Sequence, residues 1–230
     1  MPIKEIAVKS VMTKSNLPVA DFSVNPYIGC THACRYCYTS FMKRFTNHPE
    51  TWGEFIDIKN WEPIKHPEKY AGKDAFFGSV TDPYQPCEEK YRRTRKLLEE
   101  LAGSGIKISI ATKNDLVLRD LDLIKNFSEA RVSFSINTLD DGFRSEMDRA
   151  ASIERRFSAM KTFYDAGVQT TCFISPIFPG ITDPIAIIER AKEQCNLVWL
   201  ETLNLRGDYK AKILAWIHEK HPELDSLYYP

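Results

Sequence analysis

Three cysteines within eight residues constrain this chain more than any other feature of its sequence. They are Cys30, Cys34 and Cys37, and they account for half of the six cysteines in the protein. Thiolates are soft ligands that favour iron–sulfur clusters, zinc or copper(I). A cubane 4Fe–4S cluster normally takes four cysteines. Three thiolates would therefore leave one iron of such a cluster free to bind another molecule.

Two other uses of these cysteines have to be weighed against a cluster. A disulfide framework is disfavoured, because Cys87, Cys172 and Cys195 are scattered along a long chain whose first residues have no apolar signal core. A structural zinc site would need a fourth ligand. His32 lies inside the motif and cannot easily turn to the same centre, so His48 is the conceivable candidate. A zinc site remains the less favoured alternative.

Composition narrows the class of protein. The 230 residues are 43% hydrophobic, which is enough for a substantial core, and Lys+Arg equals Asp+Glu at 31 each. Nucleic-acid-binding domains usually carry a basic excess, so zero net charge argues weakly against one, although a nucleic-acid partner is not excluded. No apolar run is long enough to span a bilayer. Free cysteines without an export signal predict a cytoplasmic protein.

The spacing of apolar residues along the chain predicts an irregular N-terminal arm over residues 1–23 and a single domain over residues 24–230. Extended segments are expected at 23–28, 75–80, 106–112, 131–136, 168–175 and 197–203. Helices are expected at 88–102, 115–127, 152–166, from Asp183-Pro184 onward, and at 209–218. Strands that alternate with helices indicate a parallel sheet. Six such units are too few for a closed eight-stranded barrel, so the prediction is an α/β fold, a partial (β/α)6 barrel of parallel strands.

Side chains alternate between the two faces of a strand, and this alternation predicts where polar groups gather. In each of three expected strands, apolar residues share one face and small polar residues or lysine share the other. The polar face ends in Ser79, Thr81, Lys113, Ser135 and Asn137. Active sites of parallel barrels lie at the carboxyl ends of the strands, and buried polar groups without partners are costly. We therefore expect a ligand there, unless Lys113 merely pairs with Asp82 or Asp115.

The cysteine segment, with Asn25-Pro26-Tyr27-Ile28-Gly29 before it, resembles the cluster loop of radical S-adenosylmethionine (SAM) enzymes. It looks like the spore photoproduct lyase subgroup, and most like the proteins described as radical SAM mobile pair protein B. The similarity runs from about Asn25 to Arg206. It implies a 4Fe–4S cluster on Cys30, Cys34 and Cys37 whose open iron binds SAM. Reductive cleavage would then give a 5′-deoxyadenosyl radical that abstracts hydrogen from an unidentified substrate.

The resemblance also implies roles for individual residues. The segment from Gly78 to Pro83 resembles the part that holds the amino group of SAM, which assigns Ser79, Thr81 and Asp82. Lys113 resembles the lysine that contacts the methionyl carboxylate, and Ser135 and Asn137 resemble contacts to ribose and carboxylate. Tyr36 and Tyr38 match positions whose backbone meets the adenine. Arg206 follows the last strand and is expected to contact cofactor or substrate, whereas the orientation of Glu201 and Asn204 is open.

Some candidate residues depart from the family or lack an assigned role. In photoproduct lyases a cysteine beside the second strand can donate hydrogen, and its position is taken here by Ser79. Cys87, in the loop leading off that strand, is the candidate catalytic thiol, and an ordinary half-buried cysteine at a helix start is the alternative. Cys172 and Cys195 are predicted to be structural. Asp140, Asp141, Asp148 and Arg149 are predicted to lie in a solvated loop.

Three functions follow from these observations. The first is a radical SAM enzyme of unknown substrate, which would need an electron donor such as flavodoxin or ferredoxin and could work with a companion radical SAM protein. The second is a nucleic-acid photoproduct repair enzyme. The third is a non-enzymatic module that binds zinc or an iron–sulfur cluster. Relatives of this kind usually continue past the sixth unit, so we expect a C-terminal part to be missing or replaced.

Overall fold

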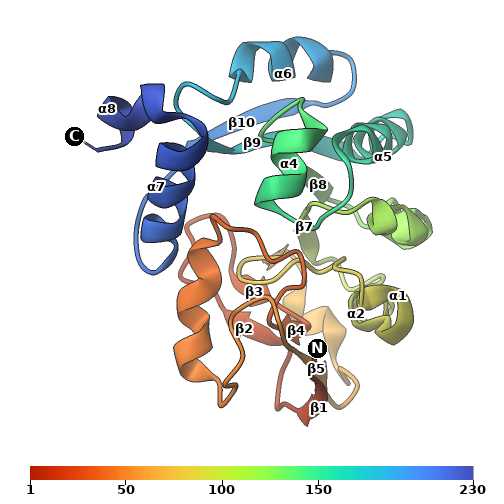
Figure 1. Ribbon diagram of the computed structural model, residues 1–230. Coiled ribbons are helices and arrows are strands. Elements are labelled where there is room, and N and C mark those ends of the chain that lie inside the picture. The colour runs from red at the N-terminus through yellow and green to blue at the C-terminus, as the bar shows by residue number, and fades with distance from the viewer. Residues whose placement is uncertain (230) are drawn as a thin grey trace.

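The computed structural model describes residues 1–229, which form two β-sheets with helices around them (Figure 1). The larger sheet has seven strands in the order β10-β9-β8-β7-β6-β3-β2. From one end of the chain to the other these are β2 (Met12–Lys14), β3 (Phe22–Val24), β6 (Asp74–Phe77), β7 (Lys107–Thr112), β8 (Ala130–Ser135), β9 (Gln169–Ile177) and β10 (Leu197–Thr202). All neighbours from β3 to β10 pair in parallel, and β2 and β10 are the two edges. The predicted partial barrel of six parallel strands is confirmed.

Helices follow the parallel strands in sequence, as the alternation predicted. The α-helices are α1 (Glu88–Tyr91), α2 (Arg93–Leu101), α3 (Leu121–Ile124), α4 (Asp141–Met147), α5 (Ile153–Asp165), α6 (Pro184–Ala191), α7 (Tyr209–Lys220) and α8 (Asp225–Tyr228). Short 3₁₀ helices are η1 (Tyr38–Phe45), η2 (Pro67–Tyr70), η3 (Asp115–Asp120) and η4 (Pro222–Leu224). Side-chain caps begin two of the longer helices: Ser152 accepts from the Arg155 amide and Asp183 accepts from the Ala186 amide.

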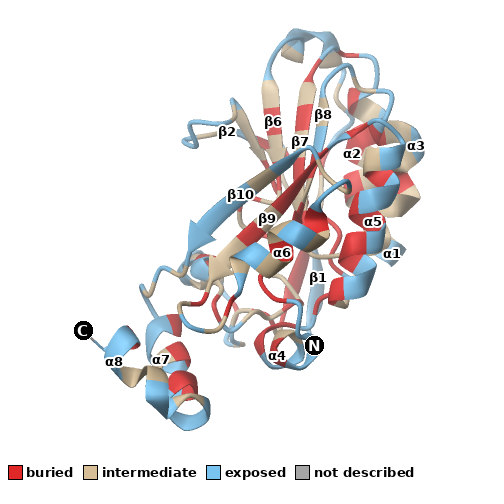
Figure 2. Ribbon diagram, turned by 90° about the horizontal axis from the view of Figure 1, so that it is seen from above, coloured by how far each residue is buried: buried red, intermediate tan, exposed pale blue. Residues whose placement is uncertain are grey.

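The main hydrophobic core lies between the large sheet and the helices on its outer face (Figure 2). Ile108, Ile110, Val132 and Phe134 all point into it and are fully or almost fully buried. The ring of Phe134 packs against Phe163 of α5, with centroids 6.1 Å apart. These residues share the strand face that was predicted to be apolar, so the opposite face, with its serines, is left to line the inside of the barrel.

The N-terminal arm is not irregular, which corrects the prediction for residues 1–23. β1 (Ile3–Ala7) pairs in parallel with β5 (Ile56–Asn60), and β4 (Tyr27–Ile28) pairs with the other side of β5 to complete a second, three-stranded sheet. β2 extends the large sheet by antiparallel pairing with β3. Both N-terminal strands are short and mostly exposed. They are strands because partners distant in sequence supply the hydrogen bonds, which local periodicity does not reveal.

Two further differences concern helices. The helix expected at 88–102 is broken at Arg92, which adopts a left-handed conformation with φ 51° between α1 and α2. Residues 141–147, predicted as loop, form α4, which begins at a cap where Asp140 accepts from the Gly142 amide. Within residues 1–229, no helix is both long and apolar enough to cross a bilayer.

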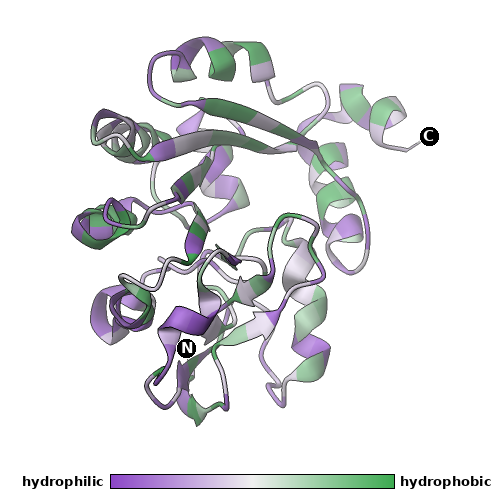
Figure 3. Cartoon of the chain, turned by 180° about the vertical axis from the view of Figure 1, so that it is seen from behind, coloured by the Kyte–Doolittle hydropathy of each residue, from purple (hydrophilic) through white to green (hydrophobic). Residues whose placement is uncertain are grey.

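The edge strand β10 is unusual because it is both apolar and exposed. Leu197, Trp199 and Leu200 are about half exposed, at 44%, 50% and 51%. Figure 2 shows β10 largely in the exposed colour, and Figure 3 shows the long strands at this edge largely in the hydrophobic colour. β10 pairs with β9 alone, so its other side is open.

We expect Phe163→Ala to lower the free energy of unfolding by about 3–5 kcal/mol, because it empties a fully buried position in the main core. Urea denaturation of the cluster-free protein measures this loss. The matched control is Ile185→Ala on α6, whose side chain is 70% exposed and whose loss should cost less than about 0.5 kcal/mol. Equal losses for the two variants would contradict the position of the core.

Candidate functional site

The loop that carries the three cysteines runs from β4 to η1. Cys30, Cys34 and Cys37 are half-buried free thiols. The chain turns into the loop at Gly29, where φ is +88° and an added Cβ would lie 2.3 Å from the carbonyl oxygen of Phe55. No other residue type fits so close to a neighbouring backbone. The loop therefore begins from a tightly packed point on the small sheet.

Burial and nearby charges both shift the pKa values of Cys30 and Cys34. Burial raises the pKa of Cys30 to about 12, and the negative charge of Asp82 adds to the effect. Burial also raises the pKa of Cys34 well above its ordinary value, while the Lys113 ammonium opposes the shift. The thiols of Cys30 and Cys34 are thus protonated at neutral pH. A bound metal centre would deprotonate them, so binding is coupled to proton release.

One side of the loop is held by the buried carboxylate of Asp82. Its Oδ1 accepts from the Tyr84 amide and from the Thr112 hydroxyl, both at 2.8 Å. Its Oδ2 accepts from the Lys113 amide at 2.7 Å and lies 3.1 Å from Nε2 of His32, inside the cysteine loop. Burial alone would raise the pKa of Asp82, but His32 and the amide donors outweigh it and lower the pKa. Asp82, predicted as a cofactor contact, has both oxygens engaged by the protein.

Two buried amides that sequence reasoning missed complete this side of the site. Gln85 accepts from the Thr31 amide at 2.9 Å and donates to the Gly29 carbonyl at 3.1 Å, so it bridges the start of the cysteine loop. Asn25 accepts from the Val80 amide at 3.0 Å and donates to the Ser79 hydroxyl at 2.8 Å. Asn25 is close to the motif in sequence and Gln85 is not, and the hydrogen-bond partners of both depend on the fold.

The other side of the loop is held by residues 147–149, at the end of α4 and just after it. The Arg35 amide donates to the Met147 carbonyl, and the Arg149 amide donates to the His32 carbonyl, both at 2.8 Å. The Tyr36 hydroxyl donates to Asp148 Oδ2 at 2.9 Å. The prediction that this segment is a solvated loop is wrong for Asp148, which is buried and anchors the loop.

A fully buried ion pair fixes Asp148 in place. Arg156 Nη2 lies 2.9 Å from Asp148 Oδ1, and neither side chain is exposed to solvent. Arg156 also donates to the carbonyls of Ala151 and Ser135, at 2.8 and 3.0 Å. The pair thus ties the cysteine loop to α5 and to the carboxyl end of β8. Breaking such a pair is costly, because it leaves an uncompensated buried charge.

The predicted polar residues do gather at the carboxyl ends of β6, β7 and β8. Ser79, Thr81, Ser135 and Asn137 are all buried. Two of their polar atoms, Thr81 Oγ1 and Asn137 Nδ2, are buried without a hydrogen-bond partner among the described residues. Buried polar atoms are nearly always satisfied in folded proteins. These two atoms therefore provide unused hydrogen-bonding capacity for a polar ligand.

Lys113 lies at the same end of the sheet. Its Nζ is 5.8 Å from the centroid of the Tyr36 ring, and no carboxylate of residues 1–229 forms an ion pair with it. The alternative in which Lys113 pairs with Asp82 or Asp115 is therefore wrong for its ammonium: its backbone amide is what binds Asp82, and Arg155 is what pairs with Asp115.

Tyr38 is the first residue of η1 and contacts the segment after β6. It is 62% exposed, and its hydroxyl donates to the Ser79 carbonyl at 2.5 Å. Burial of the phenol, with the negative charges of Cys37 and Glu201, raises the pKa of Tyr38 to about 12. Glu201 also accepts from the Ser175 hydroxyl at 2.8 Å. Arg206 is exposed, and its role stays a prediction.

The remaining candidates lie elsewhere. Cys87 packs against the small-sheet cluster of Tyr27, Ile56 and Ile58, and burial raises its pKa to about 12. His48 has both ring nitrogens near carboxylates, Asp57 at 2.9 Å and Glu50 at 3.2 Å, and it stacks on Phe55. In the described residues no group of three or more His, Cys, Asp or Glu is placed to hold a single metal ion.

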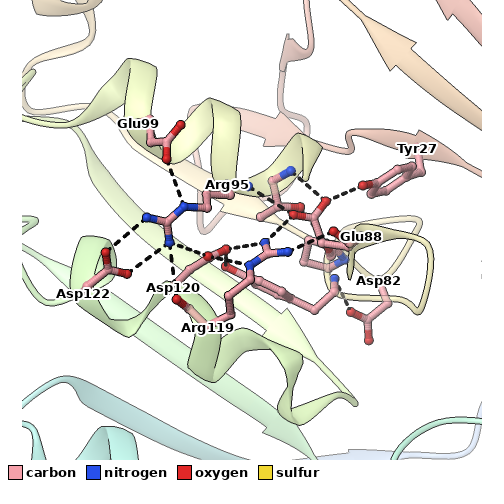
Figure 4. Close-up of polar contacts among 11 residues, drawn as sticks. Tyr27, Asp82, Glu88, Arg95, Glu99, Arg119, Asp120 and Asp122 are labelled. Carbon is pink, nitrogen blue, oxygen red and sulfur yellow. Dashed lines mark hydrogen bonds and ion pairs between the residues drawn. The ribbon is translucent and has the colours of Figure 1, made fainter. Parts of the chain in front are cut away.

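A second network of carboxylates and arginines holds β4 and the segment after β6 in place (Figure 4). Glu88 accepts from the Tyr27 hydroxyl of β4 and pairs with Arg119 of η3. Asp120 accepts from the Tyr84 hydroxyl at 3.1 Å and pairs with Arg95 and Arg119. The guanidinium of Arg95 on α2 is thus neutralised by carboxylates. This network holds the strand that leads into the cysteine loop.

Comparison with known proteins agrees with this geometry. The family model described as the radical SAM superfamily matches residues 24–191, which include the cysteine loop and the polar strand ends. The chain belongs to the radical SAM superfamily. Members of this family use a 4Fe–4S cluster and SAM, so those are its cofactors.

Individual relatives of this radical SAM protein differ in how much they share with it. An uncharacterized protein of Methanocaldococcus jannaschii is 34% identical over 222 residues, covering 96% of this chain and 84% of that protein. A radical SAM Nα-GlyT isomerase of Pseudomonas phage M6 is 24% identical over 160 residues, or 68% of this chain and 33% of that protein. A spore photoproduct lyase mutant solved with AdoMet and dinucleoside spore photoproduct has a TM-score of 0.68 at 15% identity. That match covers 96% of this chain and 66% of the lyase chain, and it shows a shared fold.

We expect Tyr36→Phe to loosen the cysteine loop of this radical SAM protein without unfolding it. The variant removes the phenol that anchors the loop to Asp148, so amide exchange at Arg35 and Arg149 should become faster. Hydrogen exchange followed by mass spectrometry on the cluster-free protein measures this.

Tyr84→Phe is the matched control, because it also removes a phenol that donates to a buried, arginine-paired carboxylate. Both variants should lower the free energy of unfolding by about 1–3 kcal/mol. Equal exchange rates at Arg35 and Arg149 in the two variants would show that Asp148 does not hold the loop.

Proposed function

We propose that this protein is an enzyme that cleaves SAM reductively and uses the 5′-deoxyadenosyl radical to abstract hydrogen from a substrate. Family membership supports SAM cleavage in general. The observation that carries the proposal for this chain is the grouping of three free thiols beside two buried, unsatisfied polar atoms, Thr81 Oγ1 and Asn137 Nδ2. The donor set fits a cluster with one open iron and a polar cofactor next to it.

In this proposal Cys30, Cys34 and Cys37 would hold the 4Fe–4S cluster, which would supply the electron for reductive cleavage of SAM. Lys113 is proposed to bind the carboxylate of SAM, and the lack of a carboxylate partner for its ammonium among the described residues supports this. Other cofactor contacts are proposed for Tyr36, Tyr38, Ser79, Thr81, Ser135, Asn137 and Arg206. Asp82 acts as a positioning residue, since its two oxygens already accept from the Tyr84 amide, the Thr112 hydroxyl and the Lys113 amide.

The proposal also includes a candidate thiol, an electron donor and a partner protein. Cys87 is kept as a candidate thiol that quenches a radical, although its contacts lie in the small sheet. An electron donor such as flavodoxin or ferredoxin would reduce the cluster, and a companion radical SAM protein is a further partner suggested by the resemblance of the sequence. Free thiols and an oxygen-sensitive cofactor suit a reducing cytoplasm.

Alanine at Cys30, Cys34 or Cys37 should abolish formation of 5′-deoxyadenosine. After anaerobic reconstitution with iron and sulfide, each variant is reduced with dithionite in the presence of SAM, and the nucleoside is quantified by chromatography. Cys195→Ala is the matched control, because this thiol is half-buried outside the loop. A wild-type protein that holds four irons and yields no 5′-deoxyadenosine would refute the proposed function.

Lys113→Ala should raise the KM for SAM by roughly 10- to 100-fold, the effect of losing one charge-assisted contact worth about 1.5–3 kcal/mol. Lys125→Ala, on the exposed end of α3, provides the control and should leave the KM unchanged. Steady-state formation of 5′-deoxyadenosine at varied SAM concentration separates KM from kcat. A loss in kcat alone would place Lys113 away from the SAM carboxylate.

A repair or modification activity on nucleic acid is the second candidate. The fold shared with a lyase bound to a dinucleoside photoproduct favours it, and the phage isomerase is a second relative with a named activity. Ser79 at the position of the hydrogen-donating thiol and zero net charge argue against lyase chemistry. Loss of spore photoproduct from ultraviolet-irradiated DNA, measured by mass spectrometry, would support it, and absence of DNA binding at low salt would refute it.

A non-enzymatic module that works with a partner is the third candidate. Metal analysis after anaerobic purification distinguishes it, because one zinc and no iron per chain would favour this candidate over an enzyme.

A further inference from the structure

The two edge strands of the large sheet differ in how they are protected from other chains. β2 has three residues and ends in Lys14, so it offers little unpaired backbone and carries a charge. β10 has six residues and contains neither lysine nor proline. Short length, lysine and proline are devices by which proteins prevent an edge strand from pairing with another polypeptide. The register shift in the pairing of β10 with β9 comes only after Leu200. β10 therefore presents a row of main-chain N–H and C=O groups over most of its length.

The helix that follows β10 leaves the strand uncovered. α7 packs with Tyr36 and Phe178 beside the cysteine loop, in a cluster that contains no residue of β10. Trp199 is 50% exposed and Leu200 is 51% exposed, and consecutive residues of a strand point to opposite faces. Figure 2 shows β10 largely in the exposed colour. A polypeptide segment paired with β10 would therefore cover apolar side chains on both faces of the strand.

One face of β10 belongs to the interior of the barrel. Trp199 is in register with Phe173 of β9, and Glu201 accepts a hydrogen bond from the Ser175 hydroxyl at 2.8 Å. Cys172 of β9 is buried in the main core outside the barrel, so Phe173 and Ser175 face the inside by alternation. Every second side chain of a strand added beside β10 would point into the same interior, where the polar ends of β6, β7 and β8 lie.

The charges around β10 favour a basic segment. Residues 193–208 include three acidic residues, Glu193, Glu201 and Asp208, and one basic residue, Arg206. None of the four forms an ion pair within residues 1–229. Opposite charges on neighbouring strands stabilise their pairing, and like charges oppose it. A second copy of this chain would bring the same acidic groups to the edge, so a segment that carries lysine or arginine fits β10 better.

The chemistry of an edge strand selects a polypeptide. Its N–H and C=O groups repeat about every 3.3 Å per residue, and another extended polypeptide presents the same groups at the same repeat. A nucleic acid has no such row of groups, and its phosphates would approach the carboxylates of Glu193 and Glu201. A small molecule would leave most of the six-residue edge unpaired.

We propose that the β10 edge, defined as Leu197–Thr202, docks an extended basic segment of a polypeptide substrate, which adds to the large sheet as a further strand. Docking rests on the edge itself, and only the role of the segment as substrate rests on the proposed function. In that role, a hydrogen atom leaves a carbon of an inward-pointing residue and becomes the third hydrogen of the 5′-methyl group of 5′-deoxyadenosine. One C–H bond breaks, one C–H bond forms, and the unpaired electron stays on the carbon of the segment.

Selection from an mRNA-display library of random short peptides tests the docking with the cluster-free protein. Peptides enriched on the wild type should carry lysine or arginine at a fixed position among alternating apolar residues. Glu201→Lys should enrich aspartate or glutamate at that position instead. Ile185→Lys on α6, at a side chain that is 70% exposed, is the control and should keep the wild-type preference. An unchanged preference in Glu201→Lys, or no enrichment on the wild type, would overturn the proposal.

Methylation of the peptide backbone shows whether the bound segment is a strand, and it leaves the protein unaltered. The most enriched peptide is synthesised with one N-methyl group at each position in turn, and fluorescence anisotropy gives each affinity. A strand donates hydrogen bonds to a given neighbour from every second residue. Methylation at alternate positions should therefore weaken binding by roughly tenfold, with little effect at the positions between. Losses without this alternation would rule out strand addition.

Two other occupants are distinguished with the same samples. Analytical ultracentrifugation measures self-association of the wild type and of Trp199→Lys, which places a lysine on the edge. If the wild type forms a dimer that Trp199→Lys dissociates and that the peptide does not disrupt, the edge pairs with a second copy and the proposal is wrong. If single-stranded DNA displaces the labelled peptide, the surface binds nucleic acid and the proposal is equally wrong.

Transfer of deuterium tests the role of the segment as substrate. The selected peptide pool is translated with deuterated amino acids and incubated with the reconstituted protein, SAM and dithionite. Mass spectrometry should then find deuterium in 5′-deoxyadenosine, and excess unlabelled peptide of the same pool should suppress it. If SAM is cleaved and no deuterium is transferred, the segment is not the substrate. If the loaded protein cleaves no SAM, the proposed function fails, and the peptide selection still decides whether β10 docks a polypeptide.

Discussion

The buried carboxylate of Asp82 is the interaction on which the rest of the site depends. It accepts hydrogen bonds from the backbone after β6, from the Thr112 hydroxyl and from the Lys113 amide, and it faces His32 in the cysteine loop. One side chain therefore sets the spacing between the loop that holds the thiols and the strand ends that hold the polar groups. A carboxylate can do this because it accepts several hydrogen bonds in different directions.

Asp148 performs a comparable task from the opposite side, and the two together explain how a loop with little regular structure keeps its shape. Asp82 ties the loop to β7, and Asp148, through Arg156, ties it to β8 and α5. Each carboxylate is buried and fully engaged, so each is costly to desolvate but is paired in place. The two carboxylates thus fix the cysteine loop relative to β7, β8 and α5.

Much of this arrangement could be predicted from the sequence, and the exceptions share a cause. The spacing of Cys30, Cys34 and Cys37, the strand order and the alternation in strands such as Val132–Asn137 are local patterns, and they gave the correct barrel. By contrast, β1 is a strand because β5 lies beside it, and Asp148 is buried because Arg156 reaches it from the next helix. Such contacts join segments distant in sequence. An acidic residue in a polar stretch looks the same whether it faces solvent or a buried guanidinium.

The exposed edge of β10 affects how this protein interacts with other polypeptide chains. A partial barrel, unlike a closed one, leaves main-chain donors and acceptors along its last strand unused, and here Leu197, Trp199 and Leu200 add apolar surface on both faces of that strand. Such an edge is a template for strand addition by another polypeptide. At high protein concentration, an uncovered β10 edge would pair with the same edge of another copy. The open edge of the partial barrel thus makes high protein concentration a condition that favours self-association.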